Sequence, residues 1–104
     1  MLKIYFTAST SFDGEFRAQN TSILSLLKSL GCKIISGEQI IDESLLKKDE
    51  KLNRQAIFDR EKKLIDEADL VVAEVTKPST GVGGEIVYAL IKGKSVLALV
   101  YKEN

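Results

Sequence analysis

The side chain with the clearest chemical potential is Glu85, which follows a glycine-rich loop and begins a predicted helix. The loop, residues 76–84, holds the chain's only proline and three glycines. The dipole at a helix start keeps a carboxylate ionised near neutral pH. An ionised carboxylate can attack an electrophilic sugar carbon and form a glycosyl ester. The alternative is an acidic residue that only complements the dipole, a contribution of about 0.3–1 kcal/mol.

Such chemistry needs a second carboxyl group that handles the proton of the departing group. The candidates are Asp59 and Glu61, in a helical stretch, and Asp69, which starts a strand at the end away from the expected site. Three basic residues share the stretch of Asp59 and Glu61, so a solvated charged face is the alternative. Tyr5 lies in the first strand, where it either fills the core or orients Glu85 through its hydroxyl.

The composition excludes several other chemistries. The chain has no histidine, which removes histidine-based triads and the usual zinc sites, so we expect no metal. Its one cysteine, Cys32, is interpreted as a small core residue and fits a reducing, cytoplasmic compartment. The 15 Lys and Arg residues balance 15 Asp and Glu residues, which argues against nucleic-acid polymers and anionic membranes as partners. No segment is apolar over the length that spans a bilayer.

Short apolar runs alternate with helical patterns along the chain. The predicted strands are residues 2–8, 32–36, 69–75 and 95–101, and the predicted helices are residues 15–30, 53–67 and 85–92. Residues 37–52 are polar and mixed, with a helix start near Asp42 as one interpretation and a solvated stretch over residues 47–51. Strands that are apolar on both faces indicate a parallel sheet covered by helices on both sides. We therefore expect one α/β domain over residues 1–104, a three-layer flavodoxin-like (Rossmann-like) sheet in the order 2-1-3-4.

The strand order also predicts where a ligand binds. In such a sheet the site lies beyond the carboxyl ends of the strands, where the order reverses. Here that point falls between the first and third strands, between residues 8–13 and residues 76–84. Gly81 and Gly83 would let the backbone approach a ligand, and the amides at the following helix start could hold an anion. A flexible turn is the alternative interpretation of the same glycines.

Two motifs resemble the nucleoside 2-deoxyribosyltransferase family. Residues 68–85 of this chain resemble its pattern A-D-x-V-V-A-E-V-T-x-P-S-x-G-V-G-x-E, and residues 4–9 are similar to its opening I-Y-F-x-G-S. Within the family, the loop is most similar to that of the 2'-deoxynucleoside 5'-phosphate N-hydrolases. The resemblance implies that Glu85 is the nucleophile on C1' of a deoxyribosyl group, that Tyr5 positions it, and that Glu61 assists the leaving base.

The same resemblance implies how the substrate is held. Ser9, Ser79 and Gly81 match residues that bind the 5'-phosphate in the hydrolases. The family uses no metal or organic cofactor, and its members are dimers or larger, with sites completed across subunits.

This chain departs from the family pattern at four places. Ala8 replaces a glycine, Ser11 stands near the position of an arginine in the hydrolases, and Glu61 replaces an aspartate. The sequence stops at Asn104, whereas the family continues into a further strand and helix that supply a phosphate-binding serine, so we expect the sheet to lack the family's fifth strand.

The expected function is hydrolysis of the N-glycosidic bond of 2'-deoxynucleoside 5'-monophosphates to free base and deoxyribose 5-phosphate. One alternative is transfer of deoxyribose between bases, although Ser79 favours a phosphate-bearing substrate. The other is a catalytically silent nucleotide-binding module.

Overall fold

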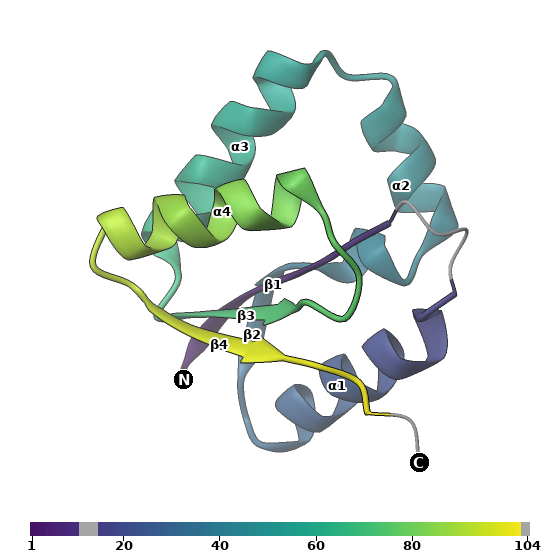
Figure 1. The fold of residues 1–104 in the computed structure, drawn as a ribbon, viewed down its shortest axis with the longest axis vertical. Coiled ribbons are helices and arrows are strands. Elements are labelled where there is room, and N and C mark those ends of the chain that lie inside the picture. Colours follow the sequence, from purple (N-terminus) through teal and green to yellow (C-terminus); the bar gives the residue numbers. More distant parts are fainter. Residues whose placement is uncertain (11–14, 103–104) are drawn as a thin grey trace.

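The fold is an α/β sandwich in which helices cover both faces of one sheet (Figure 1). The computed structural model describes residues 1–10 and 15–102. Its strands are β1 (Lys3–Ala8), β2 (Lys33–Ser36), β3 (Leu70–Glu74) and β4 (Ser95–Leu99). Its helices are α1 (Arg17–Ser29), the 3-10 turn η1 (Glu38–Ile40), α2 (Glu43–Glu50), α3 (Arg54–Glu67) and α4 (Thr80–Ile91). Within the described residues, no helix is long and apolar enough to cross a membrane.

The four strands pair in the order β2-β1-β3-β4, and every pairing is parallel. This arrangement confirms the predicted fold and strand order. β1 and β3 are the two central strands, and Tyr5 of β1 lies opposite Val71 of β3. Their carboxyl ends, at Ala8 and Glu74, therefore form the edge where the predicted site should lie.

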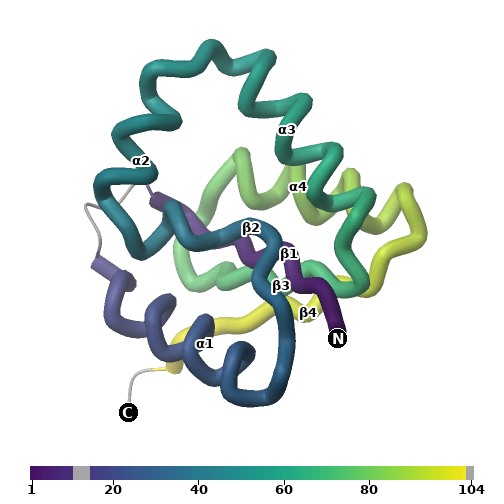
Figure 2. Tube along the Cα trace, turned by 180° about the vertical axis from the view of Figure 1, so that it is seen from behind, coloured from purple at the N-terminus to yellow at the C-terminus, as the bar shows by residue number. Residues whose placement is uncertain are grey.

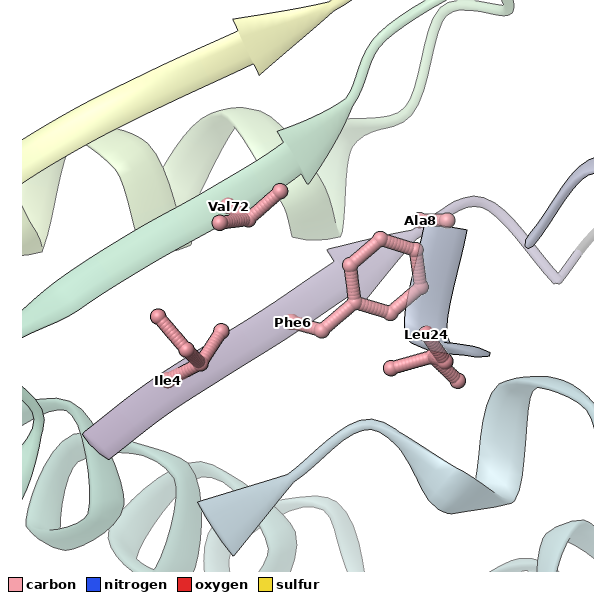
Figure 3. Packing of buried hydrophobic residues seen from close by; sticks show 5 residues of the cluster. All are labelled: Ile4, Phe6, Ala8, Leu24 and Val72. Atoms are coloured by element: carbon pink, nitrogen blue, oxygen red, sulfur yellow. The ribbon is translucent and has the colours of Figure 1, made fainter. Parts of the chain in front are cut away.

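Alternate residues of β1 face opposite sides of the sheet. Ile4, Phe6 and Ala8 pack with Val72 of β3 and Leu24 of α1, and all five side chains are buried (Figure 3). This core fixes α1 against one face of the sheet. The remaining β1 side chains must then point to the other face, where α3 and α4 lie.

The second core lies under α3 and α4. Tyr5 packs there with Val71 of β3, Ile65 of α3 and Ala89 of α4, each at most 2% exposed. The ring of Tyr5 is thus a core aromatic, as its strand position predicted. Its hydroxyl, together with the side chain of Thr7 two residues further along, lies on the face that the two helices cover.

Two of the predicted helix starts are confirmed by their caps. The Asn53 side chain accepts a hydrogen bond from the amide of Ala56 at the start of α3, and Asp42 caps α2 in the same way. Gly31 and Gly93 follow α1 and α4 with positive φ, which suits glycine at the end of a helix. In the tube view, α2 and α3 form an arch that rises away from the sheet (Figure 2).

The predicted start of α4 at Glu85 is wrong. The helix begins at Thr80, because the Ser79 hydroxyl accepts a hydrogen bond from the amide of Val82 and caps it there. Serine is a strong helix-capping residue, and this cap draws the three glycines into the helix. Glu85 therefore lies in the second turn and not in the first.

Candidate active site

The centre of the site is the hydroxyl of Tyr5, which lies between two carboxyl groups. Its oxygen is 2.7 Å from Oε2 of Glu85, and it also forms a short hydrogen bond with Oε2 of Glu61. Three elements that are far apart in sequence supply these groups: β1, α3 and α4. The structure thus brings together the three residues that the sequence predicted as catalytic.

Helical spacing explains why both glutamates face inward. Glu61 precedes the buried Ile65 by four residues on α3, and Glu85 precedes the buried Ala89 by four on α4. Residues four apart lie on the same helix face, so each glutamate continues the buried stripe beyond the apolar core. The side chain of Glu61 is only 12% exposed, which excludes the solvated-face interpretation for this residue.

Burial dominates the electrostatics of Glu85. Removal from water raises the pKa of its carboxyl, and the nearby charge of Glu61 adds to this, whereas hydrogen bonding with Tyr5 and Thr7 acts in the opposite direction. The expectation that a helix dipole holds this carboxyl ionised is therefore wrong, because Glu85 is not at the helix start. The pKa of Tyr5 is raised by burial and then by the two carboxylates, so its hydroxyl keeps its proton.

Hydrogen bonds from Arg60 hold the carboxyl group of Glu61 in place. The Arg60 guanidinium donates hydrogen bonds of 2.7 and 3.2 Å to Oε1 of Glu61, and bonds of 2.8 and 2.9 Å to the two carboxylate oxygens of Asp49. Asp49 belongs to α2, so Arg60 ties that helix to the site. The hydrogen bonds from Arg60 lower the pKa of the Asp49 carboxyl. The predicted solvated stretch over residues 47–51 is thus wrong for Asp49.

A cavity of about 280 Å³ opens above Tyr5, and both Glu61 and Glu85 line it. Its other walls come from the end of β1, from η1, and from α2 and α3. The further lining residues are Thr7, Ala8, Thr10, Gln39, Ile40, Leu46, Asp49, Glu50, Ile57 and Arg60. The cavity lies beyond the carboxyl end of β1, as the strand order predicted, but residues 76–84, the predicted second wall, do not line it.

The predicted phosphate-binding residues are spread over two places. Ser9 lines a smaller pocket with Thr10, which is shared with the main cavity. Ser79 caps α4, and the amides of Thr80 and Gly81 precede the first hydrogen bond of that helix. The roles of Ser9, Ser79 and Gly81 in substrate binding stay predictions.

The role of Gly83 in substrate binding also stays a prediction. Gly83 would contribute only the open space beside its backbone. A Cβ atom added there would meet nothing within 4 Å, while its amide already donates to the Ser79 carbonyl at 3.0 Å.

The remaining candidates lie elsewhere. Asp59 is exposed and bonded to Gln55 on the same helix, which confirms the solvated interpretation for it. Asp69 accepts a hydrogen bond from the amide of Lys3 at the opposite end of the sheet, and Cys32 packs against the core on the α1 side. Ser11 lies outside the described residues.

Sequence reasoning missed three residues at the site. Thr7 follows Tyr5 by two positions on the same strand, so the strand period could have placed it beside Glu85. Arg60 lies in a run of charged residues, which favours a solvated surface in the sequence. Asp49 had no local signal, because its position depends on how α2 packs against α3.

Comparison with known proteins gives consistent results. The family model for nucleoside 2-deoxyribosyltransferase matches residues 4–104. A protein of Thermofilum pendens, named "Putative 2'-deoxynucleoside 5'-phosphate N-hydrolase 1", is 33% identical over 103 residues, which are 99% of this chain and 71% of that protein. The 5-hydroxymethyl-dUMP N-hydrolase of Mus musculus is 37% identical over 98 residues, covering 92% of this chain and 56% of the mouse protein.

Solved structures share the fold at low sequence identity. The CMP N-glycosidase BcmB of Clostridium botulinum superposes with a TM-score of 0.66 at 19% identity, over 96% of this chain and 74% of that one. The 2-desoxiribosyltransferase of Leishmania mexicana gives a TM-score of 0.71 at 18% identity, over 98% and 66% of the two chains. With the family model matching nearly every residue, this chain belongs to the nucleoside 2-deoxyribosyltransferase family.

Proposed function

We propose that this protein hydrolyses the N-glycosidic bond of 2'-deoxynucleoside 5'-monophosphates, releasing the free base and deoxyribose 5-phosphate. The observation that carries the proposal is the pair of carboxyl groups, Glu61 and Glu85, joined through one tyrosine hydroxyl at the wall of a cavity. The names of the curated relatives support the same reaction.

The geometry of the pair favours a two-step reaction with a covalent intermediate. In glycosidases of this type, one carboxylate attacks the sugar and the other acts as acid and then base, and the two lie about 5–5.5 Å apart. Because both glutamates bond to the same hydroxyl oxygen, their nearest oxygens cannot be further apart than that range. A wider pair would leave room for water between them and would favour a single displacement.

The two glutamates then have distinct roles. Glu85 attacks C1' and forms a deoxyribosyl ester, while Glu61 donates a proton to the departing base. Glu61 next accepts a proton from the water that attacks C1' and releases Glu85. Tyr5 holds Glu85 in position, and no step requires a metal or an organic cofactor.

The phosphate end of the substrate is assigned to the start of α4 and to the loop after β1. The amides of Thr80 and Gly81 and the hydroxyl of Ser79 are suited to an anion, because a helix start carries partial positive charge. Ser9 is a second proposed phosphate contact, from the loop after β1, and Gly83 leaves open space at the start of α4. These groups favour a nucleotide over a nucleoside as substrate.

A second copy of the chain is the proposed partner. A groove of about 320 Å³ runs between α3 and α4 and reaches both Glu61 and Glu85. Phe58, which lines this groove, is 56% exposed, and α4 carries further exposed apolar side chains: Val87 at 56%, Leu90 at 57% and Ile91 at 76%. Apolar surface of this kind marks interaction sites, and a homodimer or larger oligomer would cover it. The single cysteine suits the cytoplasm as the proposed location.

An assay of base release separates the candidate functions. The purified protein is incubated with each 2'-deoxynucleoside 5'-monophosphate and each 2'-deoxynucleoside, with and without a second free base, and products are separated by chromatography. Release from monophosphates without an acceptor supports the proposal. Release that requires an acceptor indicates a transferase. Nucleotide binding without release from any compound indicates a silent binding module.

A further inference from the structure

Two carboxyl groups contact the hydroxyl of Tyr5, which has only one proton to donate. Its oxygen lies within hydrogen-bonding distance of Oε2 of Glu61 and of Oε2 of Glu85. A phenol has one hydrogen to donate, and an ionised carboxylate has none. Two full, linear hydrogen bonds at this oxygen therefore require that one of the glutamates carries a proton and donates it to the tyrosine oxygen.

The surroundings of the two glutamates make Glu85 the main holder of that proton in the free protein, with Glu61 holding it for part of the time. The other oxygen of Glu61 accepts two hydrogen bonds from the Arg60 guanidinium, and a neighbouring cation favours the ionised form. In the described part of the chain, no ion pair involves Glu85. Arg54 and Lys62 of α3 line the adjoining groove, and Asp49 of α2 faces the cavity from beyond Arg60.

We propose that Glu61, Tyr5 and Glu85 share a single proton, and that the Tyr5 hydroxyl transfers it from Glu85 to Glu61 before the glycosidic bond breaks. The proton on Oε2 of Glu85 moves to the oxygen of Tyr5, while the original hydroxyl proton moves to Oε2 of Glu61. The net charge of the three groups is unchanged. This inference rests on the proposed function for its place in a reaction, but the shared proton exists in the free protein.

The transfer prepares both carboxyl groups in one event. Afterwards Glu85 is ionised and can attack C1', and Glu61 is protonated and can supply the proton that the departing base takes up with the electrons of the broken bond. The later attack of water returns one proton to Glu61 and frees Glu85. The three groups thus begin and end each turnover with the same single proton.

Carboxyl ¹³C NMR on protein with labelled glutamate side chains tests the shared proton without any substrate. Glu61→Gln and Glu85→Gln identify the two signals, because each variant lacks one of them. In the wild type we expect an upper titration step above the ordinary glutamate pKa, because burial raises the pKa of Glu85, and we expect both signals to move in that step. In either glutamine variant, the remaining carboxyl should titrate at a lower pH than the upper step of the wild type, because its charged neighbour is gone.

The variant Tyr5→Phe tests the transfer itself. It keeps the buried ring, and in it only the signal of Glu85 should move in the upper step. Tyr88→Phe is the matched control, because it removes the hydroxyl bonded to Asp66 between the same two helices and should leave both signals moving together.

Two results would overturn the proposal: both wild-type carboxyls ionising near the ordinary value, or one wild-type signal moving alone in the upper step. If Tyr5→Phe does not fold, the wild type and the glutamine variants still decide between these outcomes. Absence of base release by the wild type would instead count against the proposed function and leave the titration result standing.

Discussion

Replacing Arg60 by methionine tests how α2 is held against the site. Methionine retains the unbranched stem but loses the four hydrogen bonds to Asp49 and Glu61. The Arg60 side chain is 37% exposed, Asp49 20% and Glu61 12%, so the cluster is intermediate between surface and buried ion pairs. Surface pairs contribute about 0.2–1 kcal/mol, and breaking buried ones costs about 3–5 kcal/mol. We therefore expect the free energy of unfolding to fall by about 1–2 kcal/mol.

Urea unfolding of Arg60→Met, followed by circular dichroism, measures this loss. Lys62→Met is the matched control, since Lys62 lies 3.7 Å from Asp59 in an exposed pair and should lose less than about 0.5 kcal/mol.

The pH dependence gives a second check. Hydrogen bonds from Arg60 lower the pKa of Asp49 from its ordinary 3.8, so this stabilisation is present above that value and is lost as the pH falls through the lowered pKa. The difference between wild type and Arg60→Met should shrink over that acid range. Equal losses in both methionine variants, or a difference independent of pH, would refute the reasoning.

Three further substitutions have expected outcomes. Gly37→Ala should lower the free energy of unfolding, measured in urea, by about 2–4 kcal/mol, because Gly37 has a φ of 132° and a Cβ there would lie 2.8 Å from a side-chain carbon of β1. Gly31 also has a positive φ but open space around it, so Gly31→Ala should cost only about 1 kcal/mol. Ser79→Ala should lose about 1 kcal/mol of helix capping and raise KM for monophosphates, whereas Asn53→Ala should lose a similar cap with KM unchanged. Glu85→Gln should melt at a higher temperature than wild type near neutral pH: burial raises the Glu85 pKa, so the contribution of Glu85 to stability is fully present below the ordinary value of 4.5 and is lost as pH rises through the raised pKa. An equal melting difference in acid and at neutral pH would contradict that account.

Most of the sheet could be predicted because its signals are local. The apolar runs that became β1 and β3 have few polar positions, and the alternation of strands with helices leaves few parallel topologies. Asn53 and Asp42 indicated where their helices begin, because a capping side chain acts on amides only two or three residues away.

The start of α4 shows a competition between local signals. Three glycines between Ser79 and Glu85 disfavour a helix interior, and they led to a predicted loop. The segment is nevertheless helical, because Ser79 caps it and because its apolar face packs into the core. Val82 and Ala89 on that face are both buried. Tertiary packing therefore outweighs the weak helix propensity of this segment.

The environment of Glu61 depends on contacts between distant segments. Nothing in residues 59–63 distinguishes a solvated charge from one tied to Asp49 and Tyr5, because those partners lie 12 and 56 positions away in the sequence. The residue types and positions indicated Glu85, Glu61 and Tyr5 as candidates, and the family resemblance implied their roles, whereas their mutual contacts through one hydroxyl came only from the structure. The bracing role of Arg60 came from the same source.

In the proposed reaction, Glu85 forms a covalent bond to the sugar. Rapid acid quenching of the protein during turnover of a 2'-deoxynucleoside 5'-monophosphate, followed by peptide mass spectrometry, tests it directly. We expect one deoxyribosyl phosphate group on the peptide that contains Glu85, and none on the same peptide of Glu85→Gln, which should release no base. An adduct on another residue, or base release by Glu85→Gln at the wild-type rate, would contradict the claim.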